Sequence, residues 1–170
     1  MLKSSWIQGL VAICWSVCGM PKVVDATLSP FADSIVVRKA DRLLLVYSHG
    51  RAIQTSRIAL GDNPVGPKVC EGDRRTPEGN YHVAARNEAS HYHRSLLLSY
   101  PSAEDRRKAQ ANGCSPGGAI MIHGLPNGMG QWGARLLAKD WTWGCVSLTD
   151  EGVDSVMAVA RVGTPVVIHP

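Results

Sequence analysis

The residues of this 170-residue chain that could do covalent chemistry are His123 and Cys145, which lie 22 positions apart. A thiol attacks a carbonyl only as the thiolate, and a free cysteine titrates at about 8.5, so a catalytic cysteine needs a neighbouring base or positive charge. His123 would supply that base. The apolar residues 119–122 lead into His123 and predict a short strand that presents it at a sheet edge.

A glycine follows the histidine and another precedes the cysteine. Gly124 lets the chain turn directly after His123, and its carbonyl could hold the imidazole in one tautomer. Gly144 opens the backbone beside the thiol, so the amides of Gly144 and Cys145 could point at a developing oxyanion. Each such donor contributes about 3 kcal/mol to transition-state stabilisation. We therefore predict a triad of cysteine, histidine and carbonyl.

The competing interpretation is structural. A lone cysteine is most often a small buried hydrophobe, and His123 would then be an ordinary strand residue with satisfied hydrogen bonds. The joint occurrence of both residues, each with a glycine beside it, favours the catalytic interpretation.

Several segments resemble the L,D-transpeptidase catalytic domain family, the YkuD-like domain. Ile122-His123-Gly124 followed by Thr142-Trp143-Gly144-Cys145 resembles its signature of histidine, spacer and Ser/Thr-x-Gly-Cys. Residues 60–68 (LGDNPVGPK) and 72–81 (GDRRTPEGNY) resemble two further family segments, and residues 163–168 (GTPVVI) resemble its closing strand. The resemblance covers residues 34 to 170, and the chain is similar to compact single-domain members of the family.

This resemblance implies a peptidoglycan L,D-transpeptidase that needs no cofactor. Cys145 would attack the carbonyl between the L-centre of diaminopimelate and the terminal D-Ala of a tetrapeptide stem, and an amine of another stem would resolve the thioester. Two features depart from the family pattern: Ser147 stands where Arg or Asn is common, and the spacer after His123 is slightly long. The departures affect the substrate and leave the catalytic pair intact.

Three alternatives stay open at this point. Attack by water would make the protein an L,D-carboxypeptidase, or an amidase that trims a wall-attached protein or peptide crosslink. A non-enzymatic wall-binding module would keep the groove without needing the thiol. A papain-like protease is disfavoured, because there the cysteine precedes the histidine in the chain.

Candidate substrate contacts come from two sources. Trp141, Thr142 and Trp143 surround the nucleophile, and amphipathic aromatic residues suit the walls of a peptide or sugar groove. His93 and Ser95 belong to a further stretch similar to compact family members, and Tyr81 is a candidate polar group of the groove. His91 and His93 could also share a strand face as zinc ligands, but no HExxH or paired CxxC motif supplies the other ligands, so we expect no metal site.

The first 26 residues differ from the rest. Lys3, an apolar stretch and small or branched residues before Ala26 predict a secretory signal peptide at 1–26, with an uncleaved membrane anchor as the alternative. Residues 27–170 would then form one catalytic domain, located in the periplasm of a host with an outer membrane. The mature chain would have 16 basic and 13 acidic residues, a formal charge of +3 with histidine neutral. This mild charge suits an anionic wall polymer and argues against nucleic acid as a partner.

Three cysteines would remain after cleavage. An odd number in an oxidising compartment leaves at least one thiol unpaired. Our hypothesis is that Cys70 and Cys114, both in glycine-rich loops, pair and leave Cys145 free; the simple alternative is that they stay unpaired.

The predicted fold is mainly β, a sandwich or mixed sheets with two or three short helices. Apolar, β-rich runs predict strands near residues 35–37, 43–47, 51–59, 80–86, 95–100 and 119–122, and an ordered irregular loop near 60–79. Ser102 with Asp105 predicts the start of a helix that stops at Gly113, and Thr149 predicts the start of another that ends at Gly163. The glycine-rich residues 125–130, with Trp132, would form either a flap over the site or a surface connection.

Overall fold

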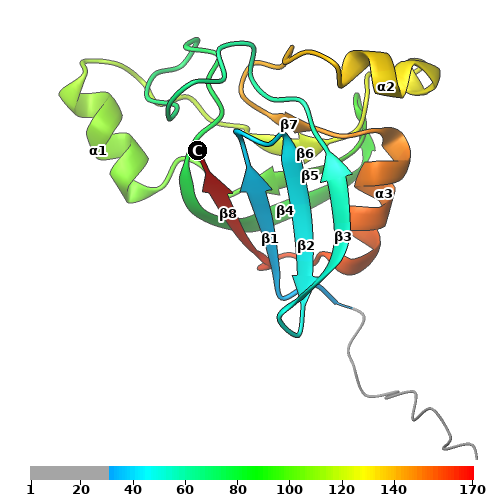
Figure 1. Cartoon of the computed structure of the whole chain (residues 1–170). Helices are drawn as coiled ribbons and strands as arrows, with labels where there is room; N and C mark the ends of the chain where they lie inside the picture. Colours follow the sequence, from blue (N-terminus) through cyan, green and yellow to red (C-terminus); the bar gives the residue numbers. More distant parts are fainter. Residues whose placement is uncertain (1–30) are drawn as a thin grey trace, which may run out of the picture.

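The computed structural model describes residues 31–170 and has eight strands in one mixed sheet, with three short helices and a 3₁₀ turn (Figure 1). The strand order is β3-β2-β1-β8-β4-β5-β6-β7. The strands are β1 (Ser34–Arg38), β2 (Leu43–Ser48), β3 (Arg51–Arg57), β4 (Gly79–Ser90), β5 (His93–Leu98), β6 (Met121–His123), β7 (Val146–Ser147) and β8 (Pro165–His169). The helical segments are α1 (Ala103–Ala111), η1 (Gly130–Trp132), α2 (Gly133–Leu136) and α3 (Asp150–Val159). The expectation of a mainly β fold with mixed sheets and short helices is confirmed.

Buried and more exposed residues alternate along the first two strands of the sheet. In β1 and β2 every second residue is buried, as expected for strands with one face on the core. β1 pairs with β2 in antiparallel and with β8 in parallel register. The last described strand therefore lies inside the sheet and not at its edge.

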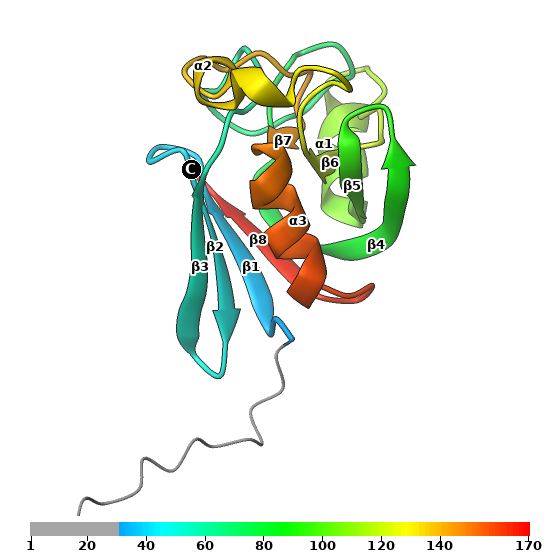
Figure 2. The same cartoon turned by 90° about the vertical axis from the view of Figure 1, so that its right-hand side faces the viewer.

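The long strand β4 connects the two halves of the molecule. Its first residues pair with β8, and its later residues pair with β5 across two register shifts. Such bulges bend a strand and increase its twist. β4 curves away from the first half and turns β5, β6 and β7 toward it, with α3 between them (Figure 2). α3 contacts β5 and β6 and contributes Val153, Val156 and Met157 to the core.

The two predicted helix starts are confirmed. The Ser102 side chain accepts a hydrogen bond from the Asp105 amide, and the Asp105 carboxylate accepts one from the Ser102 amide, which forms a capping box for α1. Thr149 caps α3 by accepting a hydrogen bond from the Gly152 amide. α3 ends at Val159, earlier than the sequence predicts, and Gly163 at φ 91° instead belongs to the turn before β8.

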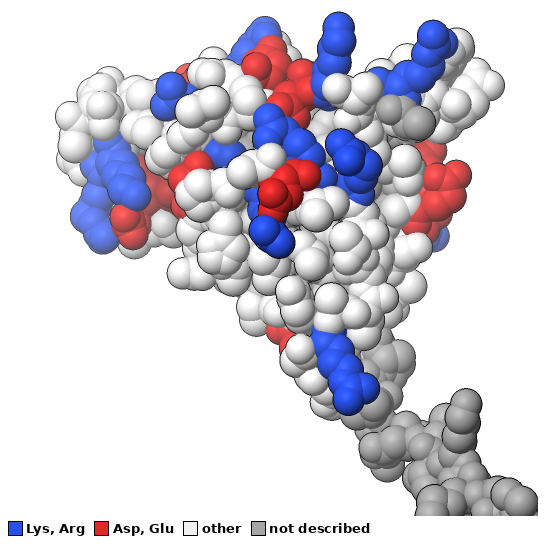
Figure 3. Space-filling model, viewed as in Figure 1, with Lys and Arg blue, Asp and Glu red and all other residues white. Residues whose placement is uncertain are grey.

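Cys70 and Cys114 form a disulfide with a Cα–Cα distance of 5.7 Å, as hypothesised, and Cys145 is the free cysteine of residues 31–170. The predicted signal peptide at 1–26 lies outside the described residues. Within residues 31–170, none of the helices has the length and apolar character needed to cross a membrane. Basic and acidic side chains alternate over the face in Figure 3 and form no continuous basic patch there.

Candidate active site

His123 and Cys145 line one cavity of about 230 Å³ at the end of the sheet that holds β6 and β7. His123 is the last residue of β6, and Cys145 directly precedes β7. The two strands are parallel neighbours, with Ile122 opposite Val146 and His123 opposite Ser147. The same register that pairs these strands thus brings the histidine and the cysteine to one end of the sheet. The remaining lining residues are Tyr92, Met121, Trp141, Thr142 and Trp143.

The backbone fixes the orientation of the His123 ring. Its Nδ1 lies 2.6 Å from the carbonyl oxygen of Gly124, which can only accept, so Nδ1 carries the proton and Nε2 is the basic nitrogen. Only 2% of the residue is exposed. Burial lowers the pKa of His123 from its ordinary value, and the Gly124 hydrogen bond opposes this shift in part. The ring is therefore neutral and able to accept a proton at neutral pH.

Two aromatic side chains pack against the imidazole ring of His123. The ring centroid of Tyr92 lies 4.5 Å from that of His123 at a tilt of 39°, and Trp141 lies 5.9 Å away in a T-shaped arrangement. These contacts exclude water from the ring and leave it little freedom to rotate.

The Cys145 thiol contacts the backbone that leads into β6. The Met121 amide donates to Sγ at 3.4 Å, and Sγ lies 3.7 Å from the Ala119 carbonyl oxygen. Within residues 31–170 there is no direct hydrogen bond between Sγ and His123. Burial raises the pKa of the Cys145 thiol, while the Met121 amide and the charge of Lys68 act in the opposite direction. The resting pair is thus a neutral thiol and a neutral imidazole, and proton transfer requires the two side chains to approach each other.

Gly144 is at a position that only glycine fits. Its φ is 122°, and a β-carbon there would lie 2.6 Å from the Arg75 carbonyl oxygen and 3.2 Å from Cδ1 of Ile120. The close packing places the chain of residues 74–75 directly behind the nucleophile. The sequence signature anticipates a glycine here but not the loop that requires it.

One of the two amides expected at an oxyanion site is already occupied. The Gly144 amide donates to Oγ1 of Thr142 at 3.1 Å, and the same hydroxyl donates to the Cys145 carbonyl at 2.7 Å. The Cys145 amide, in contrast, has no hydrogen-bond partner within residues 31–170. The expectation of two free donors is therefore corrected in this state to one, because the Thr142 side chain folds back on its own turn.

The predicted substrate contacts divide into two groups. Trp141, Thr142 and Trp143 line the cavity with the catalytic pair. Trp143 is 69% exposed at its mouth, and the guanidinium carbon of Arg74 lies 4.5 Å from its ring centroid. Arg74 also forms an ion pair with Asp62. Nothing in the local sequence pattern around Arg74 indicates that its side chain lies over Trp143.

Tyr81, His93 and Ser95 do not line the cavity. The Tyr81 hydroxyl is buried and donates to the Asp105 carboxylate at 3.1 Å; burial and that charge raise its pKa. His93 Nε2 lies 2.9 Å from Asp154 on α3. Ser95 is opposite His123 in the antiparallel register of β5 and β6, so its buried side chain lies beside the histidine and not in the cavity.

Residues 125–130, expected to form either a flap or a surface connection, form a turn that leads into η1 and α2, and Trp132, at 42% exposed, does not line the cavity. Among the described residues there is no cluster of three or more His, Cys, Asp or Glu side chains arranged to hold a metal ion.

Comparison with known proteins agrees with this geometry. The family model of the L,D-transpeptidase catalytic domain, YkuD, matches residues 32–168. YafK of Escherichia coli (strain K12), named as a candidate L,D-transpeptidase, is 28% identical over 129 residues, which are 72% of this chain and 44% of YafK. The chain thus spans less than half the length of this curated relative.

Solved structures share the fold. The helical cell shape determining protein Pgp2 of Campylobacter jejuni superposes with a TM-score of 0.59 at 24% identity, over 82% of this chain and 49% of Pgp2. Bd1075 of Bdellovibrio bacteriovorus gives 0.58 at 22% identity, over 84% and 51% of the two chains. An L,D-transpeptidase of Mycobacterium tuberculosis H37Rv gives 0.50 at 15% identity, over 81% and 57%.

Proposed function

Because this chain belongs to the L,D-transpeptidase catalytic domain family, we propose that it is an acyltransferase that acts on peptidoglycan stem peptides through a Cys145 thioester. The donor is a tetrapeptide stem, and the bond cleaved joins the L-centre of diaminopimelate to the terminal D-Ala. The acceptor is a side-chain amine of a second stem, so the product is a wall crosslink.

The observation that carries the proposal is the pairing of one oriented base with one free thiol. The Gly124 carbonyl leaves Nε2 of His123 as the acceptor, and the free cysteine of residues 31–170 lines the same cavity. A neutral imidazole suits a base that must take the proton from a neutral thiol.

The proposed reaction has two halves. His123 Nε2 takes the thiol proton as Sγ attacks the donor carbonyl, and the Cys145 amide stabilises the oxyanion of the tetrahedral intermediate. The intermediate collapses when the imidazolium returns this proton to the leaving nitrogen, which departs as D-Ala and leaves the thioester. The acceptor amine then attacks the thioester, its proton passes to His123, and Sγ leaves to regenerate the thiol.

Trp141, Thr142 and Trp143 line the proposed donor site. The exposed ring of Trp143, held beneath Arg74, offers a flat apolar surface at the mouth of the cavity for the stem or its attached sugar. Tyr81, His93 and Ser95 lie outside this contact set. Ser95 on β5 lies opposite His123 on β6. The Tyr81 hydroxyl donates to Asp105 in α1, and His93 on β5 contacts α3.

The proposed location is the periplasm. The signal peptide at 1–26 would direct export and then be cleaved, which leaves residues 27–170 as the catalytic domain. No observation favours a wall-attached protein as a partner, so the proposal is limited to stem peptides. Attack of water on the same thioester would make the enzyme an L,D-carboxypeptidase, and the test must therefore identify the acceptor.

The test is mass spectrometry of the products formed from disaccharide-tetrapeptide stems by the purified protein, with Cys145→Ala alongside. Crosslinked dimers that have lost one D-Ala are the expected result, and Cys145→Ala should form none. Tripeptide without dimers would replace the transpeptidase with the hydrolase. No product from either stems or intact wall, with a folded protein, would contradict the proposed function altogether.

A further inference from the structure

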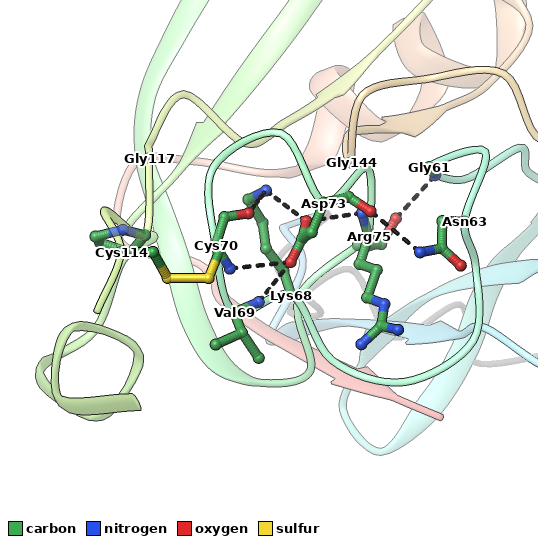
Figure 4. Close-up of polar contacts among 12 residues, drawn as sticks. Gly61, Asn63, Lys68, Val69, Cys70, Asp73, Arg75, Cys114, Gly117 and Gly144 are labelled. Carbon is green, nitrogen blue, oxygen red and sulfur yellow. Dashed lines mark hydrogen bonds and ion pairs between the residues drawn. A yellow bond between two sulfur atoms is a disulfide. The ribbon is translucent and has the colours of Figure 1, made fainter. Parts of the chain in front are cut away.

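Two loops that are far apart in sequence are crosslinked to each other (Figure 4). The first runs from β3 to β4 and the second from α1 to β6. The Cys70–Cys114 disulfide crosslinks them, and the Glu71 amide donates to the Ser115 carbonyl at 2.7 Å. A β-carbon at Gly117 would lie 3.1 Å from that of Glu71, so the two loops are in close contact. They form one unit beside the cavity.

The Asp73 carboxylate accepts four hydrogen bonds within the first loop. One carboxylate oxygen accepts hydrogen bonds from the amides of Val69 and Cys70 at 2.7 and 3.0 Å. The other accepts from the Arg75 amide at 3.0 Å and from Nζ of Lys68 at 2.8 Å. Burial raises the pKa of Asp73, but the Lys68 hydrogen bond and the three amide donors outweigh it and hold the pKa below its ordinary value. The carboxylate is thus the ionised centre of a tight turn.

This turn packs directly against the two glycines behind the cavity. The Arg75 carbonyl oxygen would lie 2.6 Å from a β-carbon at Gly144, and the Arg74 carbonyl oxygen 2.1 Å from one at Gly61. Gly61 pairs in turn with Thr142, which holds the turn around Cys145. Asp73 holds the amide of Arg75, and the carbonyl of the same residue limits where Gly144 can lie.

The second loop contacts Gly144 and Cys145 from another direction. Cδ1 of Ile120 would lie 3.2 Å from a β-carbon at Gly144, and the Ala119 carbonyl lies 3.7 Å from the thiol. The disulfide thus connects the two surfaces between which Gly144 and Cys145 lie.

We propose that Asp73 is a positioning residue for Cys145: through the backbone of Arg75, whose amide it binds and whose carbonyl abuts Gly144, it holds Gly144 and the Cys145 amide in place, and the Cys70–Cys114 disulfide fixes this support against the second loop. The inference rests on the proposed function for its catalytic consequence, but the geometric consequence can be measured without any substrate. Asp73 touches neither the thiol nor the substrate site, so its effect reaches Cys145 only through the backbone.

The full-length protein is compared with Asp73→Asn and with Asp105→Asn as a matched control. Asp105 is buried, whereas Asp73 is partly buried; like Asp73 it accepts backbone and side-chain hydrogen bonds, from Ser102 and Tyr81, but it caps the distant start of α1. Both variants lose charged hydrogen bonds of similar kind, and only one of them supports Gly144.

The first readout is hydrogen exchange, measured on a peptide that covers residues 141–147. We expect Asp73→Asn to accelerate exchange there by about tenfold or more, because the turn loses charged hydrogen bonds. Asp105→Asn should accelerate exchange at α1 and leave residues 141–147 unchanged. Exchange at 141–147 that is unchanged in Asp73→Asn, or equally faster in both variants, would overturn the proposal.

The second readout is D-Ala release per folded protein. Asp73→Asn should lower kcat by about 10- to 100-fold, as expected for a small displacement of a nucleophile, while KM changes little. Asp73→Glu keeps the charge but moves the oxygens, so it should restore neither kcat nor exchange. A kcat within twofold of wild type for Asp73→Asn would overturn the inference and leave the proposed function intact. If the two variants change hydrogen exchange as expected but the wild-type protein releases no D-Ala, the proposed function is contradicted and the geometric part of the inference stands.

Should Asp73→Asn fail to fold, the double variant Cys70→Ser, Cys114→Ser tests the same support. It removes the crosslink and leaves the Asp73 hydrogen bonds in place. We expect faster exchange at 141–147 and at least about threefold lower kcat at a temperature at which the variant stays folded. Unchanged exchange and kcat in this folded variant would contradict the proposed coupling.

Discussion

The Gly124 carbonyl oxygen lies 2.6 Å from Nδ1 of His123, so the residue directly after the histidine determines which ring nitrogen is basic. This short bond and the burial of the ring have opposite effects on the pKa, and the effect of burial is larger. The histidine is thereby held as a neutral base in the cavity that also holds the Cys145 thiol.

The pH profile should report this shift. The base must be neutral to accept the thiol proton, and burial lowers its pKa below the ordinary 6.5. Activity should therefore persist as the pH falls through 6.5 and be lost only at lower pH, when His123 becomes protonated. The measurement is kcat/KM for D-Ala release between pH 4 and 8; an acidic midpoint at or above 6.5 would contradict the assignment. Replacement of His123 by Ala should lower kcat by about 10²- to 10⁴-fold.

Gly144→Ala should be strongly disruptive. The added β-carbon would lie 2.6 Å from the Arg75 carbonyl oxygen, and a φ of 122° strains any other residue by about 1–3 kcal/mol. We expect a lower free energy of unfolding and nearly complete loss of D-Ala release. Gly118→Ala is the control, because a β-carbon there meets nothing within 4 Å, and its stability should change by less than about 0.5 kcal/mol. Denaturant titration of both variants measures the difference.

Thr142→Val should affect catalysis as well as stability, because Thr142 holds the turn around Cys145. The hydroxyl bridges the Gly144 amide and the Cys145 carbonyl, so its loss leaves both without a partner and costs about 1–3 kcal/mol. We expect lower stability together with lower kcat. Thr164→Val is matched, since Thr164 is also buried and accepts from the Arg161 amide at 2.9 Å far from the cavity. It should lose stability but keep kcat; equal kcat in the two variants would argue against a role for the Thr142 bridge.

Trp143→Ala should affect substrate binding and not folding. The side chain is 69% exposed and contacts Arg74 through a cation–π interaction, so its removal should change stability by no more than about 1 kcal/mol. We expect KM for stems to rise several-fold with kcat nearly unchanged. Trp132→Ala provides the comparison, because Trp132 is exposed beneath Arg135 but lies outside the cavity. A similar rise in KM for both variants, measured by steady-state kinetics, would remove Trp143 from the substrate site.

Local patterns were sufficient for much of the fold. The apolar run at residues 43–47, the capping pair Ser102 and Asp105, and the helix start at Thr149 each depend on neighbours within a few residues, and each prediction agrees with the structure. His123 and Cys145 were also proposed from sequence, because their chemistry and adjacent glycines are local features, and the structure brings both to one cavity.

Features that depend on distant contacts could not be read in this way. His93 begins β5 at a φ of 60° and contacts Asp154, which requires α3 to lie against that strand. Tyr81 reaches Asp105 only because β4 passes α1. The occupied Gly144 amide depends on the rotamer of Thr142, and the need for glycine at 144 depends on the loop of Arg75. Spacing along the chain contains none of this information.

The position of β8 between β1 and β4 affects the order in which this protein can fold. Residues 34–57 can form their hairpins early, but neither they nor β4 have a partner on the remaining side until residues 165–169 join the sheet. Pairing between segments so distant in sequence is slow and leaves strand edges exposed in the meantime. The edges of β1 and β4 therefore stay open to association with other chains until β8 has paired with both.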